Sequence, residues 1–170
     1  KSKDLDYAVE CSSFEEMRND ILSKGGTIFL EKPEFLTIRA RLGKETKDFT
    51  CCRTEGEYYD GRHPTSVSIG DIFSDLSRRD FTMYAIAKDE DGKYIDPFNG
   101  VADMKSNLIR CVGNTHQRFT EDGLRILRAL RFSVVKSMNL DIEIVNFLIF
   151  ANVKEFLRGV STDRIREELF

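Results

Sequence analysis

Short apolar segments alternate with polar turns over the first two thirds of the chain. Segments rich in Thr, Ile and Phe are typical of strands, and they occur at residues 4–9, 27–30, 36–42 and 47–53. After the first of these, Ser13 and Glu16 form the S-x-x-E pattern that starts a helix, and Gly25-Gly26 ends it. Residues 60–64 have the composition of a turn or loop. This alternation predicts an α/β domain over residues 1–112.

The pattern becomes helical after residue 113. Apolar positions recur with helical spacing at 120–138, 141–151 and 161–170, and no strand-like segment separates them. An all-α domain over residues 113–170 is therefore expected. The last of these helices runs to the final residue without a stop signal, so we expect the natural protein to continue beyond it.

Composition narrows the classes of partner. The net charge of −3, with 41% hydrophobic and 32% charged residues, indicates a globular protein and not a generally basic nucleic-acid binder. Any contact with a nucleic acid is then expected to come from a local basic surface or a bound metal ion. The sequence shows neither a signal peptide nor an apolar run long enough to span a membrane. Four cysteines without a C-x-x-C pair indicate free thiols and a cytoplasmic or other reducing compartment: Cys11, Cys51, Cys52 and Cys111.

Two short charged motifs are candidates for binding groups. On a strand, Asp4 and Asp6 project to the same face, where paired carboxylates can hold Mg²⁺. The same alternation also suits an exposed strand face. The Arg78-Arg79-Asp80 segment can bind a triphosphate and a ribose hydroxyl, or it can be a solvated charge cluster at the end of a short helix.

Residues 121–132 carry the most specific pattern. Asp122 and Arg125 are three apart, which predicts that they are neighbours on one helix face, and Arg128 and Arg131 continue the series. The leucines between them are expected to point inward: Leu124, Leu127 and Leu130. Alternatively, these charged residues form ordinary ion pairs on the surface of a helix, but this interpretation leaves the strict spacing of the arginines unexplained.

The chemistry of the bases gives the Asp122 and Arg125 pair a function. Cytosine and adenine each present an amino donor beside a ring-nitrogen acceptor, whereas guanine and uracil present a carbonyl beside an N–H. A carboxylate acceptor next to a guanidinium donor therefore fits C and A and mismatches G and U. Because unpaired polar groups are costly, such side chains can replace a template strand.

Collinear motifs resemble those of the class II tRNA nucleotidyltransferase and poly(A) polymerase family. They are Lys3-Asp4-Leu5-Asp6, residues 57–64, Asp75 to Thr82 with Arg78-Arg79-Asp80, Asp96 to Gly100 with Ile109-Arg110, residues 121–132, and Ser161 to Leu169. The resemblance implies an α/β polymerase-β-like nucleotidyltransferase head at 1–112 and an all-α neck at 113–170. The match covers nearly the whole chain.

The resemblance also implies roles for individual residues. Asp4 and Asp6 match the metal-binding carboxylates, and Asp48 resembles the third acidic position. Nucleotide binding falls to Arg79, to the base-reading pair Asp122 and Arg125, and to two residues near the triphosphate, Arg128 and Arg131. Asp60 and Arg62 fall in a flexible loop that helps the site change from C to A addition.

The activity implied is addition of C and A to the 3′ end of tRNA from CTP and ATP, by a two-metal mechanism with Mg²⁺. The alternatives are a poly(A) polymerase or A-adding enzyme of the same family, or an inactive fragment that binds nucleotide or RNA.

Three features depart from the family pattern. The family's glycine pair followed by Arg-Asp, which precedes the D-x-D motif, is missing because the chain begins at Lys1. Tyr84 stands where the family usually has Asn. The helical body and tail that grip tRNA are absent after Phe170.

Overall fold

The computed structural model describes residues 6–58 and 64–169. Three residues with predicted roles lie outside these ranges: Asp4, Asp60 and Arg62. The chain forms two compact units, Lys1–Gly56 with Ser66–Asp75, and Glu57–Thr65 with Leu76–Phe170. Within the described ranges, no helix has the length and apolar character needed to cross a membrane.

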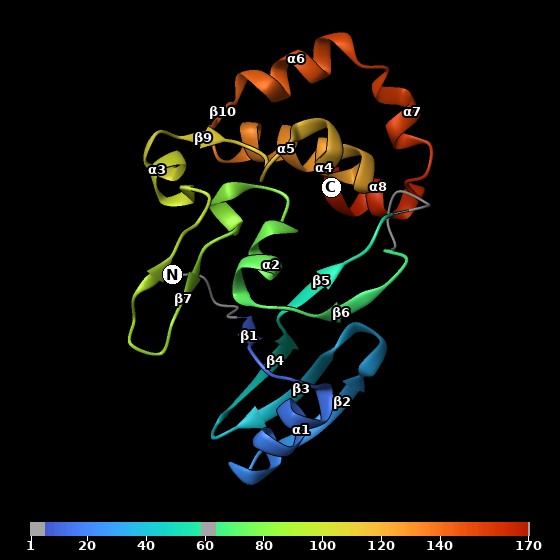
Figure 1. The fold of residues 1–170 in the computed structure, drawn as a ribbon. Helices are drawn as coiled ribbons and strands as arrows, with labels where there is room; N and C mark the ends of the chain where they lie inside the picture. Colours follow the sequence, from blue (N-terminus) through green and yellow to red (C-terminus); the bar gives the residue numbers. More distant parts are fainter. Residues whose placement is uncertain (1–5, 59–63, 170) are drawn as a thin grey trace. The chain divides into compact units, whose positions relative to one another are not determined.

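The first unit is built on a four-stranded sheet in the order β1-β4-β3-β2 (Figure 1). β1 runs parallel to β4, and the other two pairings are antiparallel. Helix α1 packs on this sheet, and the core between them contains Met17, Ile21, Ile38 and Phe49. The elements are β1 Tyr7–Val9, α1 Phe14–Ser23, β2 Thr27–Lys32, η1 Pro33–Phe35, β3 Thr37–Leu42, β4 Glu45–Cys51, β5 Arg53–Glu55 and β6 Val67–Ile69.

The predicted helix start in this unit is confirmed. The side chain of Ser13 accepts a hydrogen bond from the backbone N–H of Glu16 and caps α1. The strand predicted at 47–53 is wrong at its end, because the chain changes partner at Cys52. The Cys52 carbonyl accepts a hydrogen bond from Gly70, and residues 53–55 pair with β6. A change of partner leaves no mark on the alternation of side chains, so the pattern reads as one strand.

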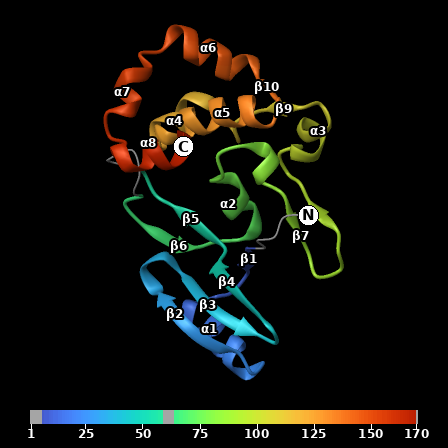
Figure 2. The same ribbon diagram turned by 180° about the vertical axis from the view of Figure 1, so that it is seen from behind.

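The second unit is mainly helical. In both views α6 and α7 follow one another in an arch over α4 and α5, and α8 returns beside them (Figures 1 and 2). After α2 Ile72–Ser77, which leads into this unit, the elements are η2 Thr82–Tyr84, β7 Ala87–Lys88, β8 Tyr94–Ile95, α3 Gly100–Lys105, β9 Leu108–Ile109, α4 Thr115–Glu121, α5 Leu124–Val135, β10 Asn139–Leu140, α6 Ile142–Phe150, α7 Val153–Leu157 and α8 Thr162–Leu169.

The helix predicted at 120–138 is two helices, so that prediction is wrong. α4 ends at Glu121, Asp122 has an extended backbone, and α5 begins at Leu124. A Cβ atom on Gly123 would lie 2.0 Å from the carbonyl oxygen of Phe156. The break therefore lets α7 approach the chain where no side chain intervenes, a requirement of packing that helical periodicity does not record.

A short strand also lies in the region expected to be all helix. β10 pairs in parallel with β9, and the Asn139 and Asp141 N–H groups bond the carbonyls of Asn107 and Ile109. Two residues are too few to show alternation, so the sequence gives no strand signal there. The core of this unit joins Phe81 and Ile109 with residues beyond 112, including Phe119, Ile126 and Ile144. The division at 112 stays a prediction about domains.

Candidate active site

The first unit brings Asp6, a predicted metal-binding residue, and Asp48, the candidate third acidic residue, to the β1–β4 pairing. β1 pairs with β4 through Tyr7 and Phe49, so the same register continued by one residue sets Asp6 opposite Asp48. Residues opposite one another on adjacent strands share a face of the sheet. Asp6 is exposed and precedes β1, while Asp48 lies within β4.

Asp48 already has a partner that sequence reasoning missed. Arg39 on β3 lies opposite it and donates from Nε at 2.7 Å and from Nη2 at 2.6 Å. This two-pronged hydrogen bond lowers the pKa of Asp48 and raises that of Arg39. The alternation of Thr37–Leu42 contains Arg39 as an outward residue, but only strand register identifies its partner.

The carboxylates of Asp6 and Asp48 are hard oxygen donors of the kind that Mg²⁺ prefers, but both oxygens of Asp48 accept hydrogen bonds from Arg39. Among residues 6–58 and 64–169 there is no cluster of three or more side chains able to hold a metal. Asp4, the other residue of the predicted pair, is not among them.

The Arg-Arg-Asp segment is held by its backbone in the second unit. Thr82 N–H bonds Arg110 O at 2.9 Å, and Val112 N–H bonds Asp80 O at 3.1 Å. Inside the turn, the hydroxyl of Thr82 donates to the buried Asp103 at 2.7 Å, and Arg110 donates to the same carboxylate. These contacts fix the position from which Arg79, the predicted nucleotide-binding residue, projects.

The Asp96 to Gly100 motif supports the same turn. The Asp96 carboxylate accepts from the N–H groups of Gly100 and Val101 at 2.7 and 2.9 Å, which starts α3. A Cβ on Gly100 would meet Thr82 O at 2.0 Å, so only glycine allows this approach. The Asp96 to Gly100 motif thus packs its backbone against the turn that follows the Arg-Arg-Asp segment and helps to hold it in place.

Asp122 lies at the junction of α4 and α5 and is not on a helix face. Its Oδ1 accepts from the Leu124 N–H at 3.0 Å, which forms a local turn between α4 and α5. Arg164 of α8 donates to both carboxylate oxygens, at 3.3 Å to Oδ1 and 2.7 Å to Oδ2. The prediction that Asp122 and Arg125 share one helix face is therefore wrong, because Asp122 has an extended backbone and its side chain bonds the backbone locally, which competes with helix continuation.

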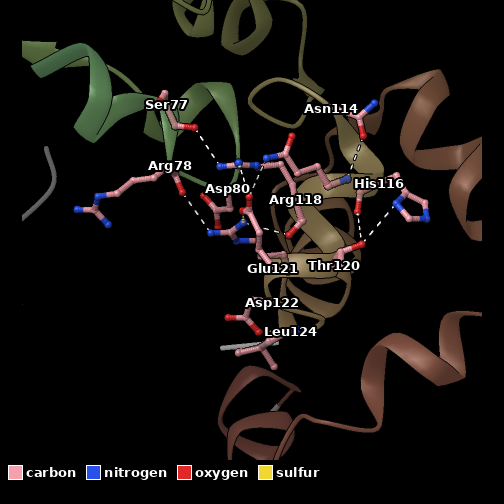
Figure 3. Close-up of polar contacts among 12 residues, drawn as sticks. Ser77, Arg78, Asp80, Asn114, His116, Arg118, Thr120, Glu121, Asp122 and Leu124 are labelled. Carbon is pink, nitrogen blue, oxygen red and sulfur yellow. Dashed lines mark hydrogen bonds and ion pairs between the residues drawn. The ribbon is translucent and has the colours of Figure 1, made fainter. Parts of the chain in front are cut away.

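Arg125 belongs to a network of three charged residues, and the other two, Arg118 and Glu121, are labelled in Figure 3. Glu121 receives Arg118 at 2.5 Å and Arg125 at 2.6 Å on its two oxygens. The arginines also donate to the backbone carbonyls of Ser77 and Arg78, at 3.0 and 3.2 Å. The network therefore joins α4 and α5 to the segment that carries Arg79.

Burial dominates the electrostatics of this network. The side chains of Arg118, Glu121 and Arg125 are each only 11–12% exposed. Burial lowers the pKa of Arg118, and the nearby Glu121 charge opposes that shift. The two guanidinium groups share the single Glu121 carboxylate, and both also donate to backbone carbonyls.

Arg128 and Arg131 also have carboxylate partners. Arg128 donates to Asp80 at 2.7 Å, and Arg131 donates to the buried Glu168 of α8 at 2.6 Å. Burial lowers the pKa of Arg128, but the charge of Asp80 and its hydrogen bond raise it overall. Arg128 and Arg131 lie beside the ring of Phe132, at 5.3 and 4.3 Å from its centroid.

The expected inward leucines are only partly confirmed. Leu124 is buried, but Leu130 is 39% exposed, whereas the Arg125 side chain is 12% exposed. Ion pairing explains the reversal, since the carboxylates of the second unit draw the arginines onto the packed side of α5. The buried positions of α5 are Leu124, Ile126, Ala129 and Phe132.

Sequence reasoning missed the partners that hold the predicted residues. Arg164 and Glu168 lie in the Ser161 to Leu169 motif, where neither was given a role, and Arg118 was not singled out. The spacing of four between Arg164 and Glu168 was visible in the sequence. Their partners, Asp122 and Arg131, are 42 and 37 residues away in the chain, so no local pattern reveals them. Tyr84, the departure from the family pattern, is 40% exposed and lies with its ring 5.3 Å from that of Phe132.

An α/β unit with carboxylates at one strand pairing, followed along the chain by a helical unit that carries paired arginines, is typical of nucleotidyltransferases. Residues 1–110 match the family described as Poly A polymerase head domain. The chain belongs to this family, and the predicted fold class, a nucleotidyltransferase head followed by helices, is confirmed.

Relatives extend the similarity through the helical region. The CCA-adding enzyme of Lactobacillus helveticus (strain DPC 4571) is 43% identical over 133 residues, which are 78% of this chain and 33% of that protein. The Bacillus stearothermophilus CCA-adding enzyme in complex with CTP matches with a TM-score of 0.77 at 30% identity, over 96% of this chain and 38% of that one.

A tRNA nucleotidyltransferase complexed with a primer tRNA and an incoming ATP analog gives the same TM-score at 29% identity, over 99% of this chain and 46% of that one. The chain spans about a third of the curated relative and less than half of each solved structure.

Proposed function

We propose that the protein adds C and A to the 3′ end of tRNA, using CTP and ATP without a nucleic-acid template. The observation that carries the proposal is the α4–α5 junction, where Asp122 and Arg125 are each held in place and still have hydrogen-bonding capacity. Among the described residues, Asp122 accepts two bonds on Oδ1 and one on Oδ2. A carboxylate offers roughly four acceptor positions, so one on Oδ2 remains.

Arg125 has a matching surplus of donors. Within the described chain, its Nη1 donates to Glu121 and to the Arg118 carbonyl, and its Nη2 donates to Arg78. A guanidinium carries about five N–H groups, which leaves Nε–H and one Nη2–H. An acceptor and a donor fixed in this way suit the amino group and ring nitrogen of C or A. Guanine and uracil present the opposite order.

The remaining residues complete the proposed chemistry. Asp6 and Asp48, with Asp4, would hold Mg²⁺, which when bound neutralises charge on the triphosphate. Arg79, Arg128 and Arg131 are assigned to the triphosphate, and Asp60 and Arg62 to the change from C to A addition. Most of the catalysis then comes from positioning the substrates and stabilising charge, because the protein takes little covalent part in phosphoryl transfer. The relatives named CCA-adding enzyme support C and A over A alone.

The test is incubation of tRNA lacking CCA with each labelled NTP, using the longest natural form of the protein. We expect incorporation of CTP, then of one ATP after C addition, and little UTP or GTP. A long A tail from ATP alone would instead identify a poly(A) polymerase. No incorporation of any NTP in Mg²⁺ would contradict the proposal and favour a nucleotide-binding role.

A further inference from the structure

One face of the sheet in the first unit carries the candidate metal-binding carboxylates. Side chains alternate between the two faces of a strand, so the buried Ile38 and Phe49 face the core shared with α1. Their neighbours Arg39 and Asp48 lie opposite one another on the other face. The register of β1 with β4, continued by one residue, sets Asp6 opposite Asp48 on that same face. Arg39 therefore lies beside the strand pairing that is assigned to the metal ion.

Arg39 binds the same two oxygens that Asp48 would offer to a metal ion. Its Nε–H donates to Oδ1 at 2.7 Å, and its Nη2–H donates to Oδ2 at 2.6 Å. Each oxygen keeps a further lone pair, but a second cation at the same carboxylate is repelled by the guanidinium. Asp48 therefore has to give up all or part of this ion pair before it can bind Mg²⁺.

The ion pair is exposed enough to open. The side chains of Arg39 and Asp48 are 54% and 36% exposed. Ion pairs with this exposure are weak, because water solvates both groups when they separate. A divalent ion also attracts the carboxylate more strongly than a guanidinium does, since it carries twice the charge. Displacement of Arg39 is thus feasible, and its cost appears as a moderate loss of metal affinity.

We propose that Arg39 competes with the metal ion for Asp48, and so sets the metal concentration that the protein needs. The inference rests on the proposed function and adds a form of regulation at its metal site. If Arg39 competes, its removal should tighten metal binding. If Arg39 instead supported the site by holding Asp48 in position, its removal should weaken metal binding. The direction of the change therefore distinguishes competition from support.

The measurement is a titration with Mn²⁺ followed by electron paramagnetic resonance, using the longest natural form of the protein without nucleotide or tRNA. For Arg39→Gln we expect the dissociation constant of Mn²⁺ to fall about 3- to 10-fold, the range for removal of one exposed competing cation. The Mg²⁺ concentration that gives half-maximal incorporation of CTP should fall with it. Arg39→Lys should lie between, because an ammonium keeps the charge and loses the two-pronged contact.

A matched control lies on the same strand and the same face. Arg41 is two residues beyond Arg39, is exposed, and lies opposite Thr46. Its guanidinium lies 5.6 Å from the centroid of the Phe29 ring. Arg41→Gln removes the same charge from the same surface without touching the ion pair of Asp48. We expect it to change the dissociation constant of Mn²⁺ less than about twofold, because solvent and salt screen exposed charges.

A double-mutant cycle tests whether Arg39 acts through Asp48. Arg39→Gln should have no further effect on Mn²⁺ affinity in an Asp48→Asn protein, where the contested carboxylate is gone. Circular dichroism checks that each variant is folded, and Arg39→Lys carries the test if Arg39→Gln is not. Unchanged or weaker Mn²⁺ binding by the folded variant would overturn the inference, as would equal tightening by Arg41→Gln or a natural protein that binds no Mn²⁺.

These results are independent of nucleotide transfer. A natural protein that incorporates no NTP, but binds Mn²⁺ more tightly after Arg39→Gln, would remove the proposed function and support competition at the metal site. Normal incorporation with a dissociation constant that Arg39→Gln leaves unchanged would do the reverse.

Discussion

The carboxylates of Asp6 and Asp48 are the residues on which the proposed metal chemistry depends. Asp6→Ala should lower nucleotide incorporation by about 10³-fold with the fold retained, because charge neutralisation at the triphosphate is lost. Steady-state incorporation in Mg²⁺, with circular dichroism as the check of folding, measures this. Asp20→Ala is the control, since Asp20 is an exposed carboxylate of α1 paired with Lys24. Near-normal activity of the Asp6 variant would end the metal assignment.

The ion pair between Arg39 and Asp48 predicts how the stability of this unit depends on pH. It lowers the pKa of Asp48, so the pair contributes stability above the ordinary Asp pKa of about 3.9, and that contribution is lost as pH falls through the lower folded pKa. Arg39→Gln should raise the pKa of Asp48 toward its ordinary value and make acid unfolding begin at higher pH. Carboxyl NMR titration measures the first effect. An Asp48 titration that does not move would show that Arg39 is not its main partner.

At the scale of the elements, α8 is joined to α5 by a buried carboxylate. Glu168 receives Arg131 at 2.6 Å and lies 3.6 Å from Arg128, and it is 8% exposed. Glu168→Gln leaves two partly buried guanidinium groups with less charge compensation, and we expect a loss of about 1–3 kcal/mol in the free energy of unfolding. The loss should be smaller than for a fully buried pair, because both arginine side chains are 32% exposed.

Urea unfolding measures this loss, and Glu167→Gln, an exposed neighbour on α8, should cost less than about 0.5 kcal/mol. Glu168→Gln should also change the KM of all four NTPs alike, since Arg128 and Arg131 are assigned to the triphosphate. Equal stability of the two variants would mean that α8 is held on α5 by apolar packing alone.

The helices and strands also show how much of the fold the sequence can predict. Ser13, Asp141 and the apolar repeats of α5, α6 and α8 act through neighbours within one or two turns, and these elements were predicted. The break at Asp122–Gly123 and the β9–β10 pair depend on Phe156 and Asn107, which are distant in sequence. The candidate site divides in the same way: motif spacing predicts roles for Asp122 and Arg125, but only the fold shows that Arg164 and Glu121 hold them.

At the scale of the whole molecule, charge limits how the chain can hold RNA. The net charge is −3, and much of the positive charge around the site is compensated, with Arg125, Arg128, Arg131 and Arg164 each paired to a carboxylate. These four guanidinium groups are then less available to replace counterions on phosphates. The relatives are two to three times longer than this chain, which leaves room for RNA contacts outside it.

We therefore expect the 170-residue chain to bind CTP or ATP more tightly than tRNA, and its tRNA affinity to depend strongly on salt. Each phosphate contact contributes a slope of roughly −0.7 to −0.9 in a plot of log affinity against log salt. Two or three contacts would thus lower tRNA affinity about tenfold or more between about 50 and 200 mM salt. Fluorescence anisotropy with labelled tRNA measures this, and unstructured poly(U) should bind similarly, since phosphates alone would be recognised. Tight tRNA binding that persists at the higher salt, and exceeds that of poly(U), would show that these 170 residues carry a shape-specific RNA surface of their own.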